Sequence, residues 1–324
     1  MITKELQEKI NKSYEVLKMG GVINKTYYHA PLIITYSGGK DSDVMLQLAR
    51  ECMNPDDFEV VNSHTTVDAP QTVYHIREVF KELNQAGIKT TIHNLPTKDQ
   101  TQKTMWDLCL KHGMVPTRKI RFCCKELKEA STPNRIAATG VRSSESNGRK
   151  GRDAFSTQGK TKADAHHFSL EHVREVFAEA VEDAREQKIP LETKSPWDCT
   201  FIRNAKENKN EIVNPIYEWS NSDVWEYIRD RGIKYCELYD MGYSRVGCIG
   251  CPLGGSKSME KEFADFPKYK TMYLNLMKKI IEKHKEAGDP LRNFDTPEEF
   301  MDWWINGANR QIKGQMSIED WMKG

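Results

Sequence analysis

The residues with the clearest chemical character form a short polar segment, SGGKDS at 37–42, between two apolar runs. Adjacent glycines let a backbone curl until successive N–H groups face one anion, and Lys40 adds a full positive charge. Lys40 follows the glycines directly, so the spacing differs from the G-x-x-x-x-G-K-S/T loop of kinases and GTPases. The segment therefore predicts a phosphate-binding turn, with an ordinary strand–turn–helix connection as the alternative. Its residues are Ser37, Gly38, Gly39, Lys40, Asp41 and Ser42.

Four cysteines form a second distinctive group: Cys123 and Cys124 are adjacent, while two residues separate Cys248 from Cys251. A Cys-x-x-Cys spacing is typical of zinc sites and of iron–sulfur clusters. Adjacent cysteines suit a cluster better than one zinc ion, because a cluster offers each thiolate its own iron. Zinc is the second interpretation, and four unligated thiols are the third. The other cysteines, expected to be small buried side chains, are Cys52, Cys109, Cys199 and Cys236.

The overall composition is that of a soluble protein. The chain has 324 residues, with 48 Lys and Arg against 47 Asp and Glu, so its net charge indicates neither a nucleic-acid nor a membrane partner. No stretch approaches the roughly 18 apolar residues of a membrane-spanning helix, and the N-terminal segment lacks the apolar centre of a signal peptide. We expect a cytoplasmic protein, in which cysteines serve metal binding or redox chemistry instead of disulfides.

The chemical groups need a scaffold, and the hydrophobic pattern predicts one. Short β-branched runs alternate with amphipathic helical segments, which indicates βαβ units and an α/β fold with a doubly wound, mostly parallel sheet. The glycine turn then lies at the carboxyl end of the first strand, where such sheets bind ligands. The predicted strands cover 31–37, 57–65, 89–96 and 134–142, and the predicted helices 42–52, 72–86 and 101–112.

Three regions follow along the chain. We predict an N-terminal helix at 1–30, a nucleotide-binding domain at 31–255 and a helical C-terminal region at 256–324. An insertion at about 143–210, with one helix at 170–187, is expected over the mouth of the sheet. A later helix is expected to be capped by Ser220 or Asn221.

Basic residues gather between 142 and 163, against the acidic Glu145 and Asp153. Such a stretch suits a phosphate-rich second substrate, and a solvated flexible loop is the alternative. The basic residues are Arg142, Arg149, Lys150, Arg152, Lys160 and Lys162.

Residues of about 31–255 resemble the phosphoadenosine phosphosulfate (PAPS) reductase family of PP-loop proteins. SGGKDS is similar to the PP-loop of ATP pyrophosphatases and sulfonucleotide reductases, and the four cysteines resemble the 4Fe-4S ligands of those reductases and of related thiolation enzymes. Residues 140–146 look like the family's G-x-R-x-x-E-S, and 214–225 resembles N-P-I/L followed by W-S/T-x-x-D-V-W. The resemblance implies an adenine nucleotide alpha-hydrolase-like fold that takes ATP, PAPS or adenylyl sulfate, Mg²⁺ and a 4Fe-4S cluster.

The resemblance also implies roles for individual residues. Lys40, Asp41 and Arg142 would be catalytic, and the four cysteines of the two pairs would hold the cluster. The implied nucleotide contacts are Ser37, Gly38, Gly39, Lys40, Asp41, Ser42, Asp68, Gly140 and Arg142.

Three departures from the family pattern bear on the activity. Residues 64–72 lack the glycine of the family's D-T-G-x-x-F/Y-P-E-T and carry Gln71 where the family has glutamate. No cysteine follows Cys251, whereas reductases attack with a thiolate in a C-terminal E-C-G-L-H. The third departure is the basic stretch at 142–163.

These departures favour thiolation over reduction. We expect an acceptor oxygen to attack the α-phosphorus of ATP, releasing pyrophosphate, and sulfur from a cysteine desulfurase to displace AMP, with the cluster as a candidate sulfur carrier. The chain most resembles the ATP-pyrophosphatase component of DNA phosphorothioation systems, so DNA or RNA is a candidate acceptor. A PAPS or adenylyl-sulfate reductase working with thioredoxin, with Cys199 as the first choice of nucleophile, is the alternative. A non-catalytic nucleotide and cluster scaffold ranks third, and we expect a homo-oligomer.

Overall fold

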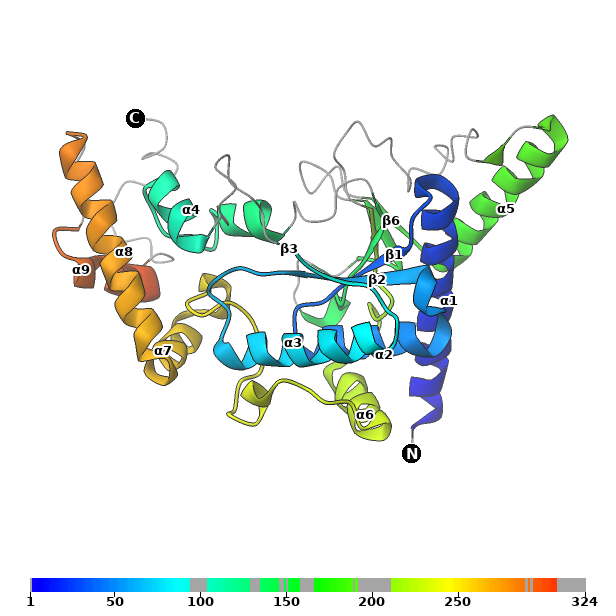
Figure 1. Ribbon diagram of the computed structural model, residues 1–324, viewed down its shortest axis with the longest axis horizontal. Helices are drawn as coiled ribbons and strands as arrows, with labels where there is room; N and C mark the ends of the chain where they lie inside the picture. Colours follow the sequence, from blue (N-terminus) through cyan, green and yellow to red (C-terminus); the bar gives the residue numbers. More distant parts are fainter. Residues whose placement is uncertain are drawn as a thin grey trace. The chain divides into compact units, whose positions relative to one another are not determined.

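The computed structural model describes most of the chain, and its secondary-structure elements are labelled in Figure 1. The described residues are 2–93, 104–128, 135–145, 149, 151–157, 166–188, 190–191, 211–288, 291 and 294–307. They belong to two compact units, described separately. The first unit is Met1–His64, Pro70–His93 and Ala130–Val246, and the second is Thr65–Ala69, Asn94–Glu129 and Gly247–Gly324.

The described part of the first unit contains a seven-stranded sheet in the order β3-β2-β1-β4-β7-β5-β6. Strands β3, β2, β1, β4 and β7 are parallel neighbours, while β5 runs antiparallel to both β7 and β6. The predicted α/β class with a mostly parallel sheet is confirmed. The strands are β1 Leu32–Thr35, β2 Phe58–Ser63, β3 Thr90–His93, β4 Ala137–Ala138, β5 Phe155–Thr157, β6 His167–Phe168 and β7 Glu211–Val213.

Helices flank this sheet, and in Figure 1 α2 and α3 run along one side of the strands. Helix α1 packs against α2 and α5, and α2 packs against α6. Ser220 caps α6: its hydroxyl accepts from the Asp223 backbone N–H, and the Asp223 carboxylate accepts from the Ser220 N–H. One of the two predicted caps is therefore confirmed. The helices of this unit are α1 Lys4–Tyr28, α2 Lys40–Cys52, α3 Pro70–Gln85, α5 Leu170–Gln187 and α6 Asn221–Arg231.

The stretch 143–210 holds more regular structure than its polar sequence indicates. Helix α5 covers the predicted residues, but β5 and β6 also lie here and extend the sheet in the antiparallel direction. Strands of three and two residues are too short for a periodic hydrophobic signal, so the sequence did not predict them. Residues 192–210 lie outside the described part of the chain.

The second unit is helical in its C-terminal part, as predicted. Helix α8 contacts α4, α7 and α9. An aromatic group fills its interior, with the Tyr273 ring 4.7 Å from that of Trp304 and 5.7 Å from that of Phe263, between ring centroids. The Trp304 side chain is buried within this group. The helices are α4 Met105–His112, α7 Ser256–Asp265, α8 Pro267–Glu286 and α9 Pro297–Asp302.

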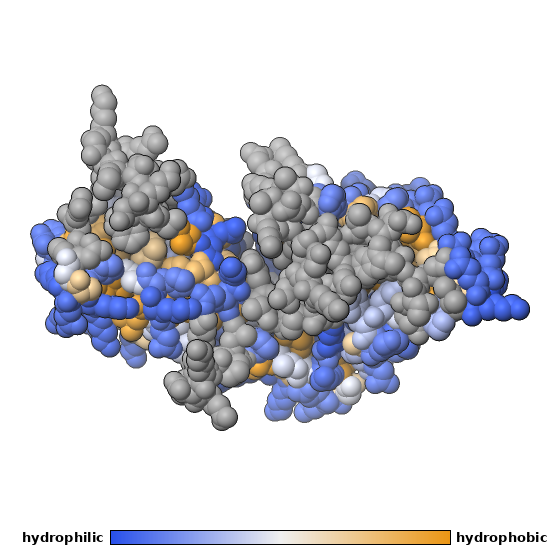
Figure 2. Space-filling view, turned by 90° about the horizontal axis from the view of Figure 1, so that it is seen from above, coloured by the Kyte–Doolittle hydropathy of each residue, from blue (hydrophilic) through white to orange (hydrophobic). Residues whose placement is uncertain are grey.

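The surface matches the polar composition. In Figure 2 the coloured residues of the viewed face are mainly hydrophilic, with separate hydrophobic areas between them. No helix in the described part of the chain is both long and apolar enough to cross a membrane.

Candidate active site

The 37–42 loop joins the end of β1 to the start of α2 in the first unit. Gly38 has a φ of 73°, and a Cβ atom there would lie 2.9 Å from Ile76 Cγ1 of α3, so both backbone and space require glycine. Gly39 caps α2 through its carbonyl oxygen, which accepts from the N–H groups of Ser42 at 2.8 Å and Asp43 at 3.0 Å. The chain therefore curls tightly between strand and helix.

This curl leaves several backbone donors unused. Within the described part of the chain, the N–H groups of Gly38, Gly39 and Asp41 have no acceptor. The Lys40 N–H donates to the Tyr239 hydroxyl at 2.9 Å, which holds the loop from the side. Because these groups lie at the N-terminal end of α2, the helix dipole adds partial positive charge to them. The loop thus has the donors of an anion-binding turn.

Two buried cations share the carboxylate of Asp41. Lys40 and Arg142 are each 4% exposed. Lys40 Nζ lies 3.2 Å from Asp41 Oδ2, and Arg142 Nε donates to Asp41 Oδ1 at 2.7 Å. Lys40 Nζ also lies 5.5 Å from the centre of the Tyr239 ring. Arg142, predicted from a motif 100 residues away, is therefore brought to the loop by β4.

The charge around Arg142 is unbalanced toward the positive. Glu145 pairs with Arg149 and, at 3.8 Å, with Arg142. Burial, and then repulsion from Arg152 and Arg245, lowers the pKa of the Arg149 guanidinium. Cations that repel one another are stabilised by an anionic ligand. The remaining basic residues of the predicted stretch, Lys150, Lys160 and Lys162, lie outside the described part of the chain.

Gly140 lies directly against the loop. A Cβ atom at this position would be 3.1 Å from both the carbonyl carbon and oxygen of Asp41, and 3.3 Å from the Ser42 nitrogen. Only a residue without a side chain lets the chain after β4 approach so closely. Gly140, predicted as a nucleotide contact, therefore shapes the loop through this close approach.

Replacing Gly140 with alanine is expected to displace the Asp41 backbone and to weaken nucleotide binding about tenfold, since overpacking costs about 1–3 kcal/mol. Isothermal titration of the variant with ATP measures the change. Gly20→Ala is a matched control, because its Cβ would lie 2.9 Å from a Val213 side-chain atom in the same unit. The control is expected to lose stability and to keep its affinity; equal affinity in both variants would refute the role of Gly140.

All four predicted cluster cysteines lie in the second unit. Cys124 begins a π-type helical turn, Cys124–Lys128, and Cys251 precedes the short helix Pro252–Gly254. The pKa of Cys123 is raised well above its usual range, first by a hydrogen bond with the Cys124 thiol and then by burial, with Cys248 and Cys251 adding to the effect. The fold thus brings the two sequence pairs into one electrostatic neighbourhood.

The segment Thr65–Ala69 runs beside Cys248. Asp68 and Cys248 form an antiparallel β-bridge, and the Ile249 N–H donates to the Val67 carbonyl at 2.8 Å. Cys248 Sγ lies 3.3 Å from Thr65 Oγ1 and 3.8 Å from Asp68 Oδ1. Asp68, to which the resemblance assigns a nucleotide contact, is therefore placed with the cysteines in the second unit.

Lys128 joins this group, and the sequence interpretation missed it. Lys128 is exposed, and the pKa of its ammonium is raised, chiefly by attraction to the Cys248 thiolate, with Asp68, Cys124 and Cys251 contributing. Burial raises the pKa of the Cys248 thiol to about 11, and Lys128 opposes that rise. A lysine four residues after Cys124 lies on the same face of a helical turn, which is the signal that could have found it.

The four paired cysteines are the candidate ligands of a metal group. Among the described residues, no three His, Cys, Asp or Glu side chains form a group that could hold a metal ion. Four sulfurs around one zinc lie about 3.8 Å apart, given Zn–S bonds of about 2.3 Å, whereas a cluster binds each thiolate at a separate iron. Four thiols and a neighbouring cation suit an anionic cluster, whose binding would release the thiol protons. These ligands would be Cys123, Cys124, Cys248 and Cys251.

Magnesium fits the described residues less well. Asp41 is the predicted carboxylate of the loop, but its two oxygens contact Lys40 and Arg142. The loop in this state therefore has no free carboxylate oxygen for Mg²⁺, so we derive no step through a protein-bound magnesium ion.

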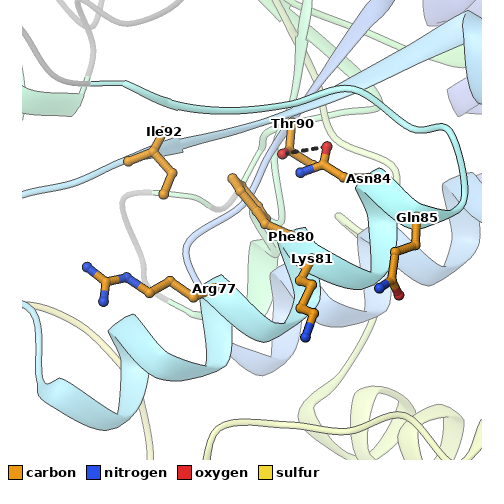
Figure 3. A pocket seen from close by; sticks show the side chains of 7 residues that line it. All are labelled: Arg77, Phe80, Lys81, Asn84, Gln85, Thr90 and Ile92. Carbon is orange, nitrogen blue, oxygen red and sulfur yellow. Dashed lines mark hydrogen bonds between the residues drawn. The ribbon is translucent and has the colours of Figure 1, made fainter.

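A hollow of about 610 Å³ lies elsewhere in the first unit, between α3 and β3 (Figure 3). Its wall includes one side-chain hydrogen bond, from Thr90 Oγ1 to Asn84 Oδ1 at 3.0 Å. No residue of the predicted motifs lines it, so the candidate active site remains at the loop. The lining residues are Arg77, Phe80, Lys81, Asn84, Gln85, Thr90 and Ile92.

Relatives of the chain were found by sequence. An uncharacterised protein of Methanocaldococcus jannaschii is 25% identical over 297 residues, which cover 91% of this chain and 54% of the relative. A second one is 24% identical over 270 residues, 82% of this chain and 45% of the relative. The chain therefore spans about half the length of these two relatives. The adenosine 5′-phosphosulfate reductase of Oceanobacillus iheyensis is 42% identical over 67 residues, 21% of this chain and 26% of that enzyme.

Solved structures with a similar arrangement include the PAPS reductase of Candida auris, 16% identical, with a TM-score of 0.42 over 76% of this chain and 96% of that one. The U34-tRNA thiolase NcsA of Methanococcus maripaludis, with its 4Fe-4S cluster, is 13% identical, with a TM-score of 0.39 over 88% of this chain and 80% of that one.

The family itself is identified by a sequence model, that of the phosphoadenosine phosphosulfate reductase domain, which matches residues 31–253. This range holds the loop, Arg142 and all four paired cysteines, and it covers more than half of the chain. The chain belongs to the phosphoadenosine phosphosulfate reductase domain family.

Proposed function

We propose that this chain binds ATP at the 37–42 loop, releases pyrophosphate as an acceptor is adenylylated, and supports sulfur transfer to that acceptor. The observation that carries the proposal is the loop itself, where three unused backbone N–H groups lie beside the buried cations Lys40 and Arg142. Departing pyrophosphate gains negative charge as the bond to the α-phosphorus breaks. Fixed donors and cations at the position of that charge stabilise the transition state.

The first step breaks one bond and forms one. An oxygen of the acceptor attacks the α-phosphorus, the bond from that phosphorus to the bridging oxygen breaks, and pyrophosphate leaves with the electron pair. ATP would enter as its Mg²⁺ complex, so the ion belongs to the substrate. Lys40 and Arg142 would turn from Asp41 to the phosphates, which exchanges one ionic partner for another at little cost in desolvation.

The second step replaces AMP with sulfur. A persulfide carried by a cysteine desulfurase would attack the acceptor atom that bears the adenylylated oxygen, the bond from that atom to the oxygen would break, and AMP would leave with the oxygen and the electron pair. A thiol would then reduce the remaining S–S bond and free the desulfurase. Cys123, Cys124, Cys248 and Cys251 would hold a 4Fe-4S cluster, which supplies iron with affinity for sulfur when bound. Arg149, which Arg152 and Arg245 repel, supports a phosphate-bearing acceptor such as DNA or RNA.

Reduction of PAPS or adenylyl sulfate with thioredoxin is the second candidate, favoured by the 67-residue likeness to an adenosine 5′-phosphosulfate reductase. That reaction needs a reactive thiolate outside the cluster. Burial raises the pKa of Cys52 to about 11 and that of Cys109 to about 12, and burial also raises the pKa of Cys236. Thiols of this kind are poor nucleophiles. Cys199, the nucleophile considered first for this alternative, lies outside the described residues.

The two functions are separated by their products. Anaerobically purified protein is incubated with ATP, alone and with DNA or RNA, and pyrophosphate is measured; a parallel incubation contains PAPS or adenylyl sulfate, thioredoxin and a sulfite assay. We expect pyrophosphate release that rises with nucleic acid. Sulfite without pyrophosphate would overturn the proposal in favour of the reductase, and tight nucleotide binding without either product would favour the scaffold.

A further inference from the structure

The residues immediately before and after the 37–42 loop are joined to each other behind it. Tyr36 lies between β1 and the loop, and its hydroxyl donates to Asp43 Oδ1 of α2 at 2.5 Å. His75 Nε2 of α3 lies 3.0 Å from the Tyr36 hydroxyl and 3.0 Å from Asp43 Oδ1. The exposed fractions of Tyr36, Asp43 and His75 are only 2%, 3% and 8%. A closed, buried triangle of polar groups therefore connects the two ends of the loop.

This triangle is not explained by stability alone. Asp43 Oδ2 is buried and has no hydrogen-bond partner within the described part of the chain. Burial raises the pKa of the Asp43 carboxyl, and the hydrogen bonds from His75 and Tyr36 oppose that rise. A buried carboxylate with an unpaired oxygen destabilises a fold relative to a well-packed apolar residue. Because Asp43 directly follows the loop, a role in holding the loop is a different explanation for the burial of its carboxylate.

Helix α3 supports the loop at neighbouring points as well. The Tyr36 ring packs against Phe80, with 5.8 Å between ring centroids. A Cβ atom on Gly38 would lie 3.1 Å from a Thr72 carbon and 2.9 Å from Ile76 Cγ1. The backbone of the loop thus rests on the same helix that provides His75.

We propose that Tyr36, Asp43 and His75 are positioning residues of the phosphate loop: they fix the spacing of its two ends, and so the convergence of its N–H groups on a phosphate, without touching the ligand. Donors that converge before binding lose less entropy when the anion arrives. The inference rests on the proposed function for the identity of the ligand, ATP or pyrophosphate. The ordering of the loop does not depend on that identity.

Tyr36→Phe removes the hydroxyl and keeps the ring in the core. Tyr227→Phe is its matched control, because Tyr227 is a fully buried phenol of the same unit that donates to the Glu51 carboxylate at 2.7 Å, far along the chain from the loop. Two quantities are measured: hydrogen exchange of the loop amides that are hydrogen-bonded in ligand-free protein, those of Ser37, Lys40 and Ser42, and the Kd for pyrophosphate and ATP by calorimetry. Thermal unfolding confirms that each variant folds.

Tyr36→Phe is expected to speed exchange of the loop amides and to raise both Kd values, each about tenfold, as a hydrogen bond to a charged group predicts. Tyr227→Phe is expected to leave the amide exchange and both Kd values unchanged, although it should lose a similar amount of thermal stability. Equal exchange and equal Kd in the two variants would overturn the proposal. His75→Gln, which retains a donor near Asp43, is expected to fall between the wild type and Tyr36→Phe.

Failure of the proposed function gives a different result. If wild-type protein binds neither ATP nor pyrophosphate, the proposed function is wrong, and exchange of the loop amides in ligand-free protein still decides the positioning role. Faster exchange in Tyr36→Phe than in Tyr227→Phe would then support that role, and equal exchange would contradict it.

Discussion

Replacing Lys40 with alanine is expected to lower pyrophosphate release from ATP about 100-fold to 1,000-fold, the range found when one preorganised charge-stabilising group is removed. Lys40 Nζ is buried between Asp41 and the Tyr239 ring beside the loop, and its turn from Asp41 to the phosphates brings its charge to the leaving group. The fold should survive, because Arg142 still neutralises Asp41. Initial rates of pyrophosphate release at saturating ATP measure the effect.

Lys9→Ala is the control for this variant. Lys9 pairs with Asp223 at 2.8 Å and with Glu5 at 2.8 Å in the same unit, so its loss also removes a lysine from ion pairs. Pyrophosphate release is expected to stay within about twofold of the wild type, because the pair lies at partly exposed surface. A Lys40→Ala rate equal to that of Lys9→Ala would show that the loop does not stabilise the leaving group.

Replacing Cys248 with serine is expected to remove most of the iron and acid-labile sulfide from anaerobically purified protein. A complete cluster has about four irons per chain, and loss of one of its four thiolates exposes it to solvent and weakens its binding. Cys248 is held in place by its β-bridge to Asp68 and its contact with Thr65. Iron, zinc and sulfide contents per chain measure the result.

Cys109→Ala is the matched control, since Cys109 is a fully buried cysteine of the same unit without a paired neighbour in the sequence. It is expected to retain the iron of the wild type. Wild-type protein that contains zinc and no iron or sulfide would contradict the cluster. Iron retained in Cys248→Ser would show that Cys248 is not one of the cluster's ligands.

The sequence predicted those parts of the site that depend on local pattern. Two glycines, a lysine and the end of an apolar run predicted the loop, because its backbone geometry is set within six residues. Helix α5 was predicted at its observed bounds, Leu170–Gln187, within an otherwise polar and charged stretch, and the structure adds a cap at Ser169.

Contacts between distant segments were not predictable in the same way. Tyr239, which binds the Lys40 N–H, is 199 residues away along the chain. His75 and Tyr36 meet across 39 residues, and nothing in their local sequences marks them as partners. Such contacts are products of tertiary packing, which periodicity and motif spacing do not encode.

The contact of Asp68 with Cys248 is another that the sequence motif does not contain. The family pattern assigns its segment to the nucleotide, while the structure places Thr65–Ala69 in the second unit beside Cys248. Residues up to His64 and from Pro70 onward belong to the first unit, and only the segment between them belongs to the second. In the sequence, this segment reads as an ordinary loop between a strand and a helix. A sequence motif describes residues that are neighbours along the chain. The β-bridge between Asp68 and Cys248 joins residues that are far apart in the sequence, so the motif does not contain it.

The most direct test of the central claim is to identify the bond of ATP that this protein breaks. Anaerobically purified protein is incubated with ATP labelled at the α- or the γ-phosphate, in the presence of DNA or RNA, and the labelled products are separated. We predict the γ label in pyrophosphate and the α label in AMP or in an adenylylated acceptor. ADP with inorganic phosphate, or intact ATP beside sulfite formed from adenylyl sulfate, would contradict the account.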